Sequence, residues 1–181
     1  MVPVSEGQWS VLEDWLETAF AGQVRKNGQP MAEHPLRVGR KLRAAGADPV
    51  TVFSGYAHGV IEDLPHVAVE DLAAVAEAVI GRKAARESVD LMLECGYSDE
   101  EYAVERLVGG EDGKKARRAA AVRRWLAGKD FRLHLVKQAD IEDSLADAAS
   151  ASPELAADFL AWAGPLHDGL TALLAARDMA G

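Results

Sequence analysis

Residues 57–65 read Ala-His-Gly-Val-Ile-Glu-Asp-Leu-Pro ("AHGVIEDLP") and place polar groups in an otherwise apolar helical pattern. The spacing predicts a helix over 49–62. On that helix His58 and Glu62 share one face, a turn apart, and Asp63 follows at the end. A buried carboxylate is costly unless a metal ion, a cation or hydrogen-bond donors accompany it. Two interpretations fit: a metal ligand beside water-orienting acids, or a core histidine followed by two acids that face water.

Apolar residues recur at spacings of three and four through most of the chain, and no convincing alternating strand pattern appears. This periodicity predicts an all-α fold, a bundle of about eight to ten helices. Glycine and proline mark the breaks between them. The expected helices are 6–21, 34–45, 49–62, 69–81, 84–95, 98–107, 113–127, 131–148, 153–162 and 165–178.

The length of 181 residues suits one sizeable core, so we expect a single domain over residues 1–181. Beyond Ser150 the chain is rich in alanine, but large apolar residues keep a helical period there. The segment 153–178 is therefore expected to supply packing helices that close the bundle.

Composition narrows the cellular setting and the class of partner. The net charge of -9 argues against a nucleic-acid-binding surface that covers most of the protein. The longest run without Asp, Glu, Lys or Arg is thirteen residues, too short to span a membrane as a helix. The acidic first twenty residues are unlike a targeting segment, and a single cysteine excludes an internal disulfide. We expect a soluble, cytoplasmic protein with neither nucleic acid nor membrane as its partner.

Basic residues are concentrated in two segments of this acidic chain. Residues 24–43 hold six basic residues against the single acid Glu33, and residues 114–124 hold six with no acid. Local positive surfaces suit a small anionic ligand. For the second segment, a solvated helix face explains the charge equally well.

Four short motifs follow one another in a recognisable order: Gly22-Gln23-x-Arg25-Lys26-x-Gly28-x-Pro30, His34-Pro35-Leu36, His58-x-x-Ile61-Glu62-Asp63 and Lys137-x-Ala139-Asp140. Together they resemble the hydrolase domain of the RelA and SpoT alarmone enzymes and their small stand-alone relatives in the HD phosphohydrolase superfamily. The resemblance runs from about residue 20 to residue 147. It implies an HD-domain-like helical bundle.

The resemblance also implies a divalent metal site. In that family one ion, usually manganese (Mn2+), is held by a histidine before proline, a histidine-aspartate pair and a distant aspartate. The matching ligands here are His34, His58 and Asp140. Glu62 and Asp63 match the adjacent acids that position or activate the attacking water.

Further matches concern the substrate. Arg25 matches the arginine that contacts the nucleotide base, and Lys26 matches a lysine that contacts phosphate. Lys137 is a further cation that can balance phosphate charge. Ser144 stands where the family has an asparagine that touches the substrate sugar, and it keeps a hydrogen-bonding group with a shorter reach.

Gly59 is the main departure, because the family has the aspartate of its histidine-aspartate pair there. Manganese prefers several oxygen donors, so the loss of one carboxylate weakens the site. Three protein ligands and water nevertheless support catalysis at other metal sites. Asp143 or Asp63 could replace the missing ligand, or the pocket could bind its anion without a metal.

These observations leave a leading function and an alternative. The leading interpretation is a metal-dependent phosphohydrolase that acts on a phosphorylated nucleotide, with guanosine 3',5'-bis(diphosphate) as the substrate that the resemblance implies. The alternative is a degenerate HD domain that binds a nucleotide without hydrolysis, as a sensor or regulatory module. A purely structural domain fits least, because Glu62, Asp63 and Asp140 are all retained.

Overall fold

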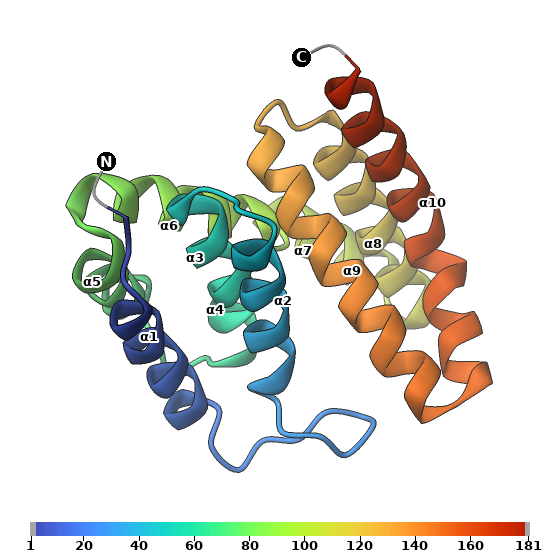
Figure 1. The fold of residues 1–181 in the computed structure, drawn as a ribbon. Coiled ribbons are helices and arrows are strands. Elements are labelled where there is room, and N and C mark those ends of the chain that lie inside the picture. The colour runs from blue at the N-terminus through green and yellow to red at the C-terminus, as the bar shows by residue number, and fades with distance from the viewer. Residues whose placement is uncertain (1–2, 180–181) are drawn as a thin grey trace. The chain divides into compact units, whose positions relative to one another are not determined.

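The computed structural model describes residues 3–179, which form helices joined by short loops (Figure 1). Within these residues, the only β-type pairing is one isolated bridge between Val24 and Pro30. The predicted all-α fold is therefore confirmed. The helices are α1 (Glu6–Ala19), α2 (Glu33–Ala44), α3 (Pro49–Ala57), α4 (Val60–Asp63), α5 (Val69–Ile80), α6 (Arg82–Cys95), α7 (Asp99–Val108), α8 (Gly110–Ala127), α9 (Phe131–Ala151) and α10 (Pro153–Asp178).

Contacts divide the chain into two compact units, Met1–Leu93 and Glu94–Gly181, here called the N-terminal and C-terminal units. The boundary falls near the end of α6. A single HD-type domain over residues 1–181 stays a prediction. Among the described helices, none combines the length and the apolar character needed to cross a membrane.

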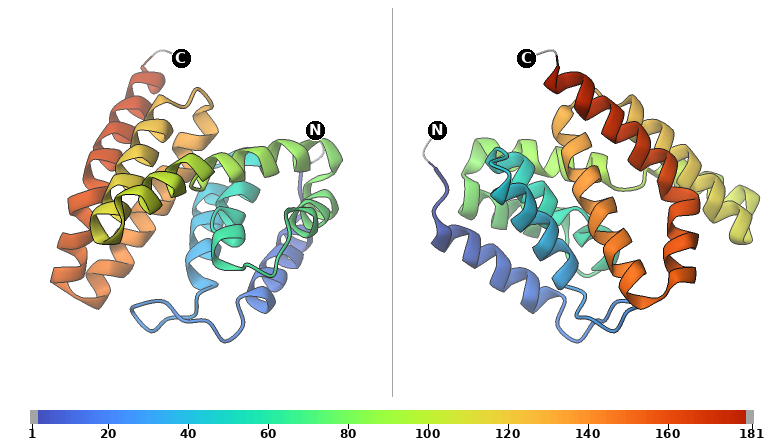
Figure 2. Two further views of the ribbon diagram at one scale, coloured as in Figure 1. Left: turned by 180° about the vertical axis from the view of Figure 1, so that it is seen from behind. Right: turned by 45° about the vertical axis from the view of Figure 1, so that its right-hand side comes forward.

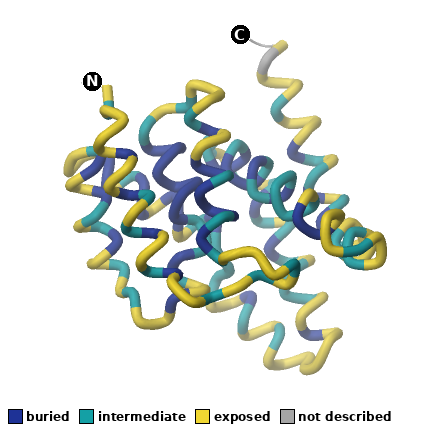
Figure 3. Tube along the Cα trace, turned by 60° about the horizontal axis from the view of Figure 1, so that its bottom comes forward, coloured by how far each residue is buried: buried dark blue, intermediate teal, exposed yellow. Residues whose placement is uncertain are grey.

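In the N-terminal unit, α1 packs against α5, α2 against α3, and α3 against α5. Ser5 caps α1 through a capping box with Gln8, which satisfies backbone donors at the helix start. Side chains that are at most 1% exposed lie in the core of this unit. They include Leu12, Leu16, Phe53, Tyr56 and Leu72. Figure 3 marks the buried residues in dark blue along the Cα trace.

Two glycines allow α2 and α3 to approach closely. A Cβ atom at Gly39 would overlap the ring of Tyr56, and a Cβ atom at Gly55 would overlap the side chain of Leu42. Tyr56 in turn stacks on Trp9, with ring centroids 5.8 Å apart. The α2–α3 contact therefore depends on the missing side chains at these two positions.

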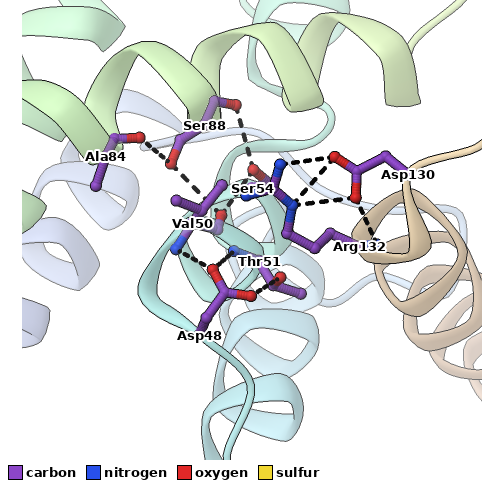
Figure 4. Close-up of polar contacts among 8 residues, drawn as sticks. All are labelled: Asp48, Val50, Thr51, Ser54, Ala84, Ser88, Asp130 and Arg132. Atoms are coloured by element: carbon purple, nitrogen blue, oxygen red, sulfur yellow. Dashed lines mark hydrogen bonds and ion pairs between the residues drawn. The ribbon is translucent and has the colours of Figure 1, made fainter. Parts of the chain in front are cut away.

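Buried polar groups at the start of α3 are satisfied within the same unit (Figure 4). Asp48 accepts hydrogen bonds from the backbone N–H groups of Val50 and Thr51 and caps the helix. The buried hydroxyl of Ser54 lies 2.8 Å from the Val50 carbonyl oxygen and 3.2 Å from that of Ser88 on α6. This network joins α3 to α6 and gives the buried Ser54 hydroxyl its partners.

In the C-terminal unit, α7 packs against α8, and α10 packs against both α8 and α9, with the long helices side by side (Figure 2). Leu133, Val136, Leu166 and Leu170 are fully buried there. Cys95 is also buried, and burial raises the pKa of its thiol to about 12, so it packs as a small apolar residue.

The prediction of two helices at 153–162 and 165–178 is wrong, because α10 runs unbroken through Pro165. Proline removes one backbone donor and disturbs the carbonyl four residues earlier, at Ala161. Both residues are exposed, so water can bond to the freed carbonyl group. Buried Ala163, Leu166 and Leu170 hold the helix against its neighbours.

Candidate metal and nucleotide site

His58 lies at a helix break rather than within a helix. The predicted helix over 49–62 is wrong: α3 ends at Ala57, His58 is its C-cap, and α4 starts at Val60. Gly59 has φ -108° and ψ -2°, a conformation open to any residue. The break separates His58 from the short helix that carries Glu62 and Asp63.

The structure brings His58 and His34 together, although they are 24 residues apart in the chain. Their Nε2 atoms are 3.1 Å apart, and the two rings meet edge to face with centroids 5.0 Å apart. His34 is buried at the start of α2, next to Pro35. Two ring nitrogens therefore converge on one point.

The orientation of the His58 ring is set by its other nitrogen. Nδ1 lies 2.8 Å from the carbonyl oxygen of Gly55, which can only accept a hydrogen bond, so Nδ1 carries the proton. In the neutral ring, the lone pair is then on Nε2 and points toward His34. Metal-ligating histidines are commonly oriented by such a backbone carbonyl.

This histidine pair lines a small cavity within the N-terminal unit. Arg25 and Asp63 supply opposite charges to its wall, and Phe20, Met31 and Pro35 supply apolar surface. The sequence did not single out Phe20 or Met31, which flank the glycine-rich turn. The complete lining is Phe20, Arg25, Met31, His34, Pro35, His58, Gly59 and Asp63.

The two predicted acids differ in their relation to the cavity. Asp63 lines it, and its Oδ2 atom lies 3.0 Å from the point that a Cβ atom on Gly59 would occupy. Both acids are exposed, and Glu62 is not among the lining residues. Both acids are in the short helix that follows His58.

A tight turn presents Arg25 to the cavity. The Arg25 N–H donates to the Gln29 carbonyl oxygen at 2.8 Å, and the Gly28 N–H donates to the Arg25 carbonyl oxygen at 2.9 Å. Gly28 has φ +83°, which favours glycine. Arg25 lines the cavity, whereas the neighbouring Lys26 is exposed and lies outside the lining.

In the C-terminal unit, three predicted residues form one cluster on α9. The Lys137 Nζ atom lies 2.7 Å from Asp140 Oδ2, and Ser144 Oγ lies 3.5 Å from Asp140 Oδ1. Lys137 also lies over the ring of Trp125, 4.1 Å from its centroid. Burial alone would lower the pKa of Lys137, but the Asp140 carboxylate outweighs burial and holds that pKa above its ordinary value.

The basic side chains of residues 114–124 mostly form ion pairs or aromatic contacts within the C-terminal unit. Arg117 forms an ion pair with Glu105 at 2.6 Å and lies over the rings of Tyr97 and Tyr102. Lys114 and Lys115 pair with acids one turn earlier on α8. These contacts favour the interpretation of this segment as a structural helix face.

Comparisons with known proteins bear on the fold of the chain. No protein-family model matches the chain. It is 39% identical over 67 residues to a GTP pyrophosphokinase of Streptomyces coelicolor, a match that spans 37% of this chain and only 7% of that protein. The structure also matches a metazoan ortholog of SpoT that hydrolyzes ppGpp and plays a role in starvation responses. The TM-score is 0.68 at 17% identity, over 93% of this chain and 88% of that one.

The chain shares the fold of this SpoT ortholog. At the level of the fold, this confirms the resemblance expected from the sequence. The substitution at Gly59 and the individual ligand assignments stay predictions.

Proposed function

We propose that the protein is a metal-dependent phosphohydrolase that acts on a phosphorylated nucleotide, with guanosine 3',5'-bis(diphosphate) as the first candidate. The pair of histidine nitrogens 3.1 Å apart is the observation that carries this proposal. It lies in a cavity whose wall also holds a guanidinium group and a carboxylate. The histidine nitrogens and the carboxylate are groups that bind metal ions, and the guanidinium group is one that binds an anionic substrate.

The spacing of the two nitrogens fits a shared ion. Two imidazole nitrogens that face each other could both bind one divalent ion, and a carboxylate would add the oxygen donor that manganese prefers.

We propose that His34, His58 and Asp140 are protein ligands of this ion. The orientation of His58 by the Gly55 carbonyl oxygen supports its role, because it leaves Nε2 available. When bound, the ion would polarise a phosphate oxygen and lower the pKa of a water molecule. Manganese is the ion that the family resemblance suggests.

The acids that follow His58 are proposed to handle the water and its proton. Glu62 and Asp63 are the only carboxylates of α4, the helix directly after the His58 break. A carboxylate within reach of the attacking water can orient it and accept its proton. Glu62 is exposed and can therefore exchange that proton with solvent.

Four residues are proposed to bind the nucleotide. Arg25 lines the cavity and can stack on the base or pair with phosphate. Lys26, in the same turn, is exposed and can reach a phosphate group. On α9, Lys137 and Ser144 flank Asp140 and can contact the phosphate and the sugar.

The direct test is hydrolysis of guanosine 3',5'-bis(diphosphate) by the purified protein with added manganese. We expect release of pyrophosphate or phosphate, and loss of that release in His58→Ala. His66→Ala is the matched control, because His66 is exposed in the loop after α4 and should leave turnover unchanged. Absence of turnover with manganese, zinc, magnesium and cobalt over a nucleotide panel would refute the proposal.

A binding measurement separates hydrolysis from simple recognition. If the protein binds the nucleotide in an Arg25-dependent way but never cleaves it, the protein is a sensor or regulatory module rather than an enzyme. Metal in stoichiometric amount in the purified protein would argue against this alternative. Isothermal titration of wild type and Arg25→Ala supplies the affinities.

A further inference from the structure

Three hydrogen bonds meet at Gln29, in the turn that presents Arg25 to the cavity. The Gln29 carbonyl oxygen accepts the Arg25 N–H at 2.8 Å, and the Gln29 N–H donates to Asn27 Oδ1 at 3.1 Å. The side-chain oxygen of Gln29 accepts a bond from Arg37 Nη1 at 3.2 Å. Two of these bonds form within the turn, and the third joins the turn to α2.

Arg37 lies on the helix that also carries one histidine of the cavity. It follows His34 by three residues, so the two side chains are neighbours on the surface of α2. Glu33 Oε2 lies 4.0 Å from Arg37 Nη1, the same atom that bonds to Gln29. The Arg37 side chain is 32% exposed, so most of it is covered by protein. The guanidinium group therefore contacts both α2 and the turn.

Little packing holds the turn in place. Gly28, Gln29 and Pro30 are all exposed, so its order depends mainly on hydrogen bonds. The bridge between Val24 and Pro30 closes the base of the turn. Bonds within a turn fix its shape but not its orientation toward a neighbouring helix. The bond from Arg37 to Gln29 acts on that orientation, because its donor belongs to α2.

We propose that Arg37 is a positioning residue for nucleotide binding: its bond to Gln29 holds the turn so that the Arg25 guanidinium group stays in the cavity. This inference rests on the proposed function, in which Arg25 binds the nucleotide. A binding group that is held in place beforehand raises affinity, because less order has to be created on binding. Arg37 therefore acts on nucleotide affinity and leaves metal binding and the chemical step unchanged.

The test measures nucleotide binding in variants at both ends of this hydrogen bond. Arg37→Ala removes the donor, and Gln29→Ala removes the side-chain acceptor but keeps the backbone bonds of the turn. The probe is guanosine 3',5'-bis(diphosphate), titrated by calorimetry without added metal. Loss of one ordinary hydrogen bond should weaken binding by about 3- to 10-fold in each variant. The double variant should lose no more than either single variant, because both changes remove the same bond.

Steady-state kinetics with added manganese and a control variant distinguish positioning from a general effect. In Arg37→Ala, KM should rise by the same factor as the dissociation constant, whereas kcat and the affinity for manganese alone should keep their wild-type values. A loss of folded protein would instead lower kcat. Lys41→Ala is the matched control, because it removes a positive charge from an exposed position one turn further along α2. It should bind the nucleotide as wild type does.

The outcomes separate this inference from the proposed function. If Arg25→Ala weakens binding while Arg37→Ala and Gln29→Ala bind as wild type does, the inference is refuted and the proposed function stands. A loss in Arg37→Ala without one in Gln29→Ala also refutes it, because Arg37 then contacts the nucleotide itself. An equal loss in Lys41→Ala refutes it as a general charge effect. If wild type neither binds nor hydrolyses the nucleotide, both proposals fail together.

Discussion

Different interactions hold the helices together within each of the two compact units. In the N-terminal unit, α2 and α3 meet through apolar side chains and two glycines, Gly39 and Gly55. In the C-terminal unit, arginines tie the helices together: Arg124 donates to Glu101 and to the carbonyl oxygens of Glu94 and Gly96. Close apolar packing is destabilised by small changes in side-chain volume, whereas a network of ion pairs is destabilised by the loss of one charge.

This difference bears on where a precise site can be built. The His34–His58 pair and its cavity lie in the unit where Gly39 and Gly55 let α2 and α3 pack closely, and residues on closely packed helices are held in one arrangement. The Lys137–Asp140 cluster lies in the unit rich in ion pairs and cation–aromatic contacts. Mutations of opposite kinds should therefore weaken the two units.

The largest expected effect is in the C-terminal unit. Arg124→Ala leaves the carboxylate of Glu101, only 6% exposed, without its charged partner, although the Ser98 backbone N–H still donates to it. Removal of the charged partner of such a carboxylate costs about 3 kcal/mol in the free energy of unfolding. Urea denaturation would measure it, with Arg123→Ala as control, because Arg123 is exposed on the same helix. Equal stabilities of the two variants would contradict the importance of the arginine network.

A smaller loss is expected in the N-terminal unit from one added methyl group. In Gly39→Ala the new Cβ would overlap the Tyr56 ring, and such overpacking costs about 2 kcal/mol. Gly7→Ala in the first turn of α1 is the control: its added Cβ would meet no neighbouring segment within 4 Å, so it should not destabilise the protein. Thermal denaturation compares them. A neutral Gly39→Ala would show that α2 and α3 can move apart freely.

The smallest expected change in stability concerns a charged contact in the N-terminal unit, where the other contacts compared are apolar. Glu13 accepts hydrogen bonds from Arg40 and Tyr56. Burial alone would raise the pKa of Glu13, but the bonds from Arg40 and Tyr56 outweigh burial and hold that pKa below its ordinary 4.5. The pKa of Glu13 is therefore lower in the folded protein than in the unfolded chain. The ionised Glu13 stabilises the fold above pH 4.5, and this contribution is lost as the pH falls through the folded pKa.

Glu13→Gln tests this dependence on pH. The variant should be about 1 kcal/mol less stable at neutral pH, since its hydrogen bonds are no longer charge-assisted. Urea denaturation from about pH 7 down to about pH 3 should show that difference shrink as wild type loses the charge. A difference that stays constant over this range would assign the contribution of Glu13 to packing alone.

Much of the fold was predictable because helix formation is largely local. Apolar spacing located most helices to within a few residues, and glycine and proline marked most of the breaks. The errors fell where neighbours override local preference. Pro165 does not end α10, since buried residues on both sides hold that helix, and the expected helix over 49–62 breaks at His58.

The sequence by itself determined the helical class, the motifs and the kinds of chemical group available for a site. The tertiary structure alone decided that His34 and His58, 24 residues apart, place their Nε2 atoms 3.1 Å apart, and that Arg25 and Asp63 line the same cavity. The reason is physical: periodicity reports which face of a helix is apolar. Which side chains then meet depends on helix packing and on the positions of helix ends, which no local pattern specifies.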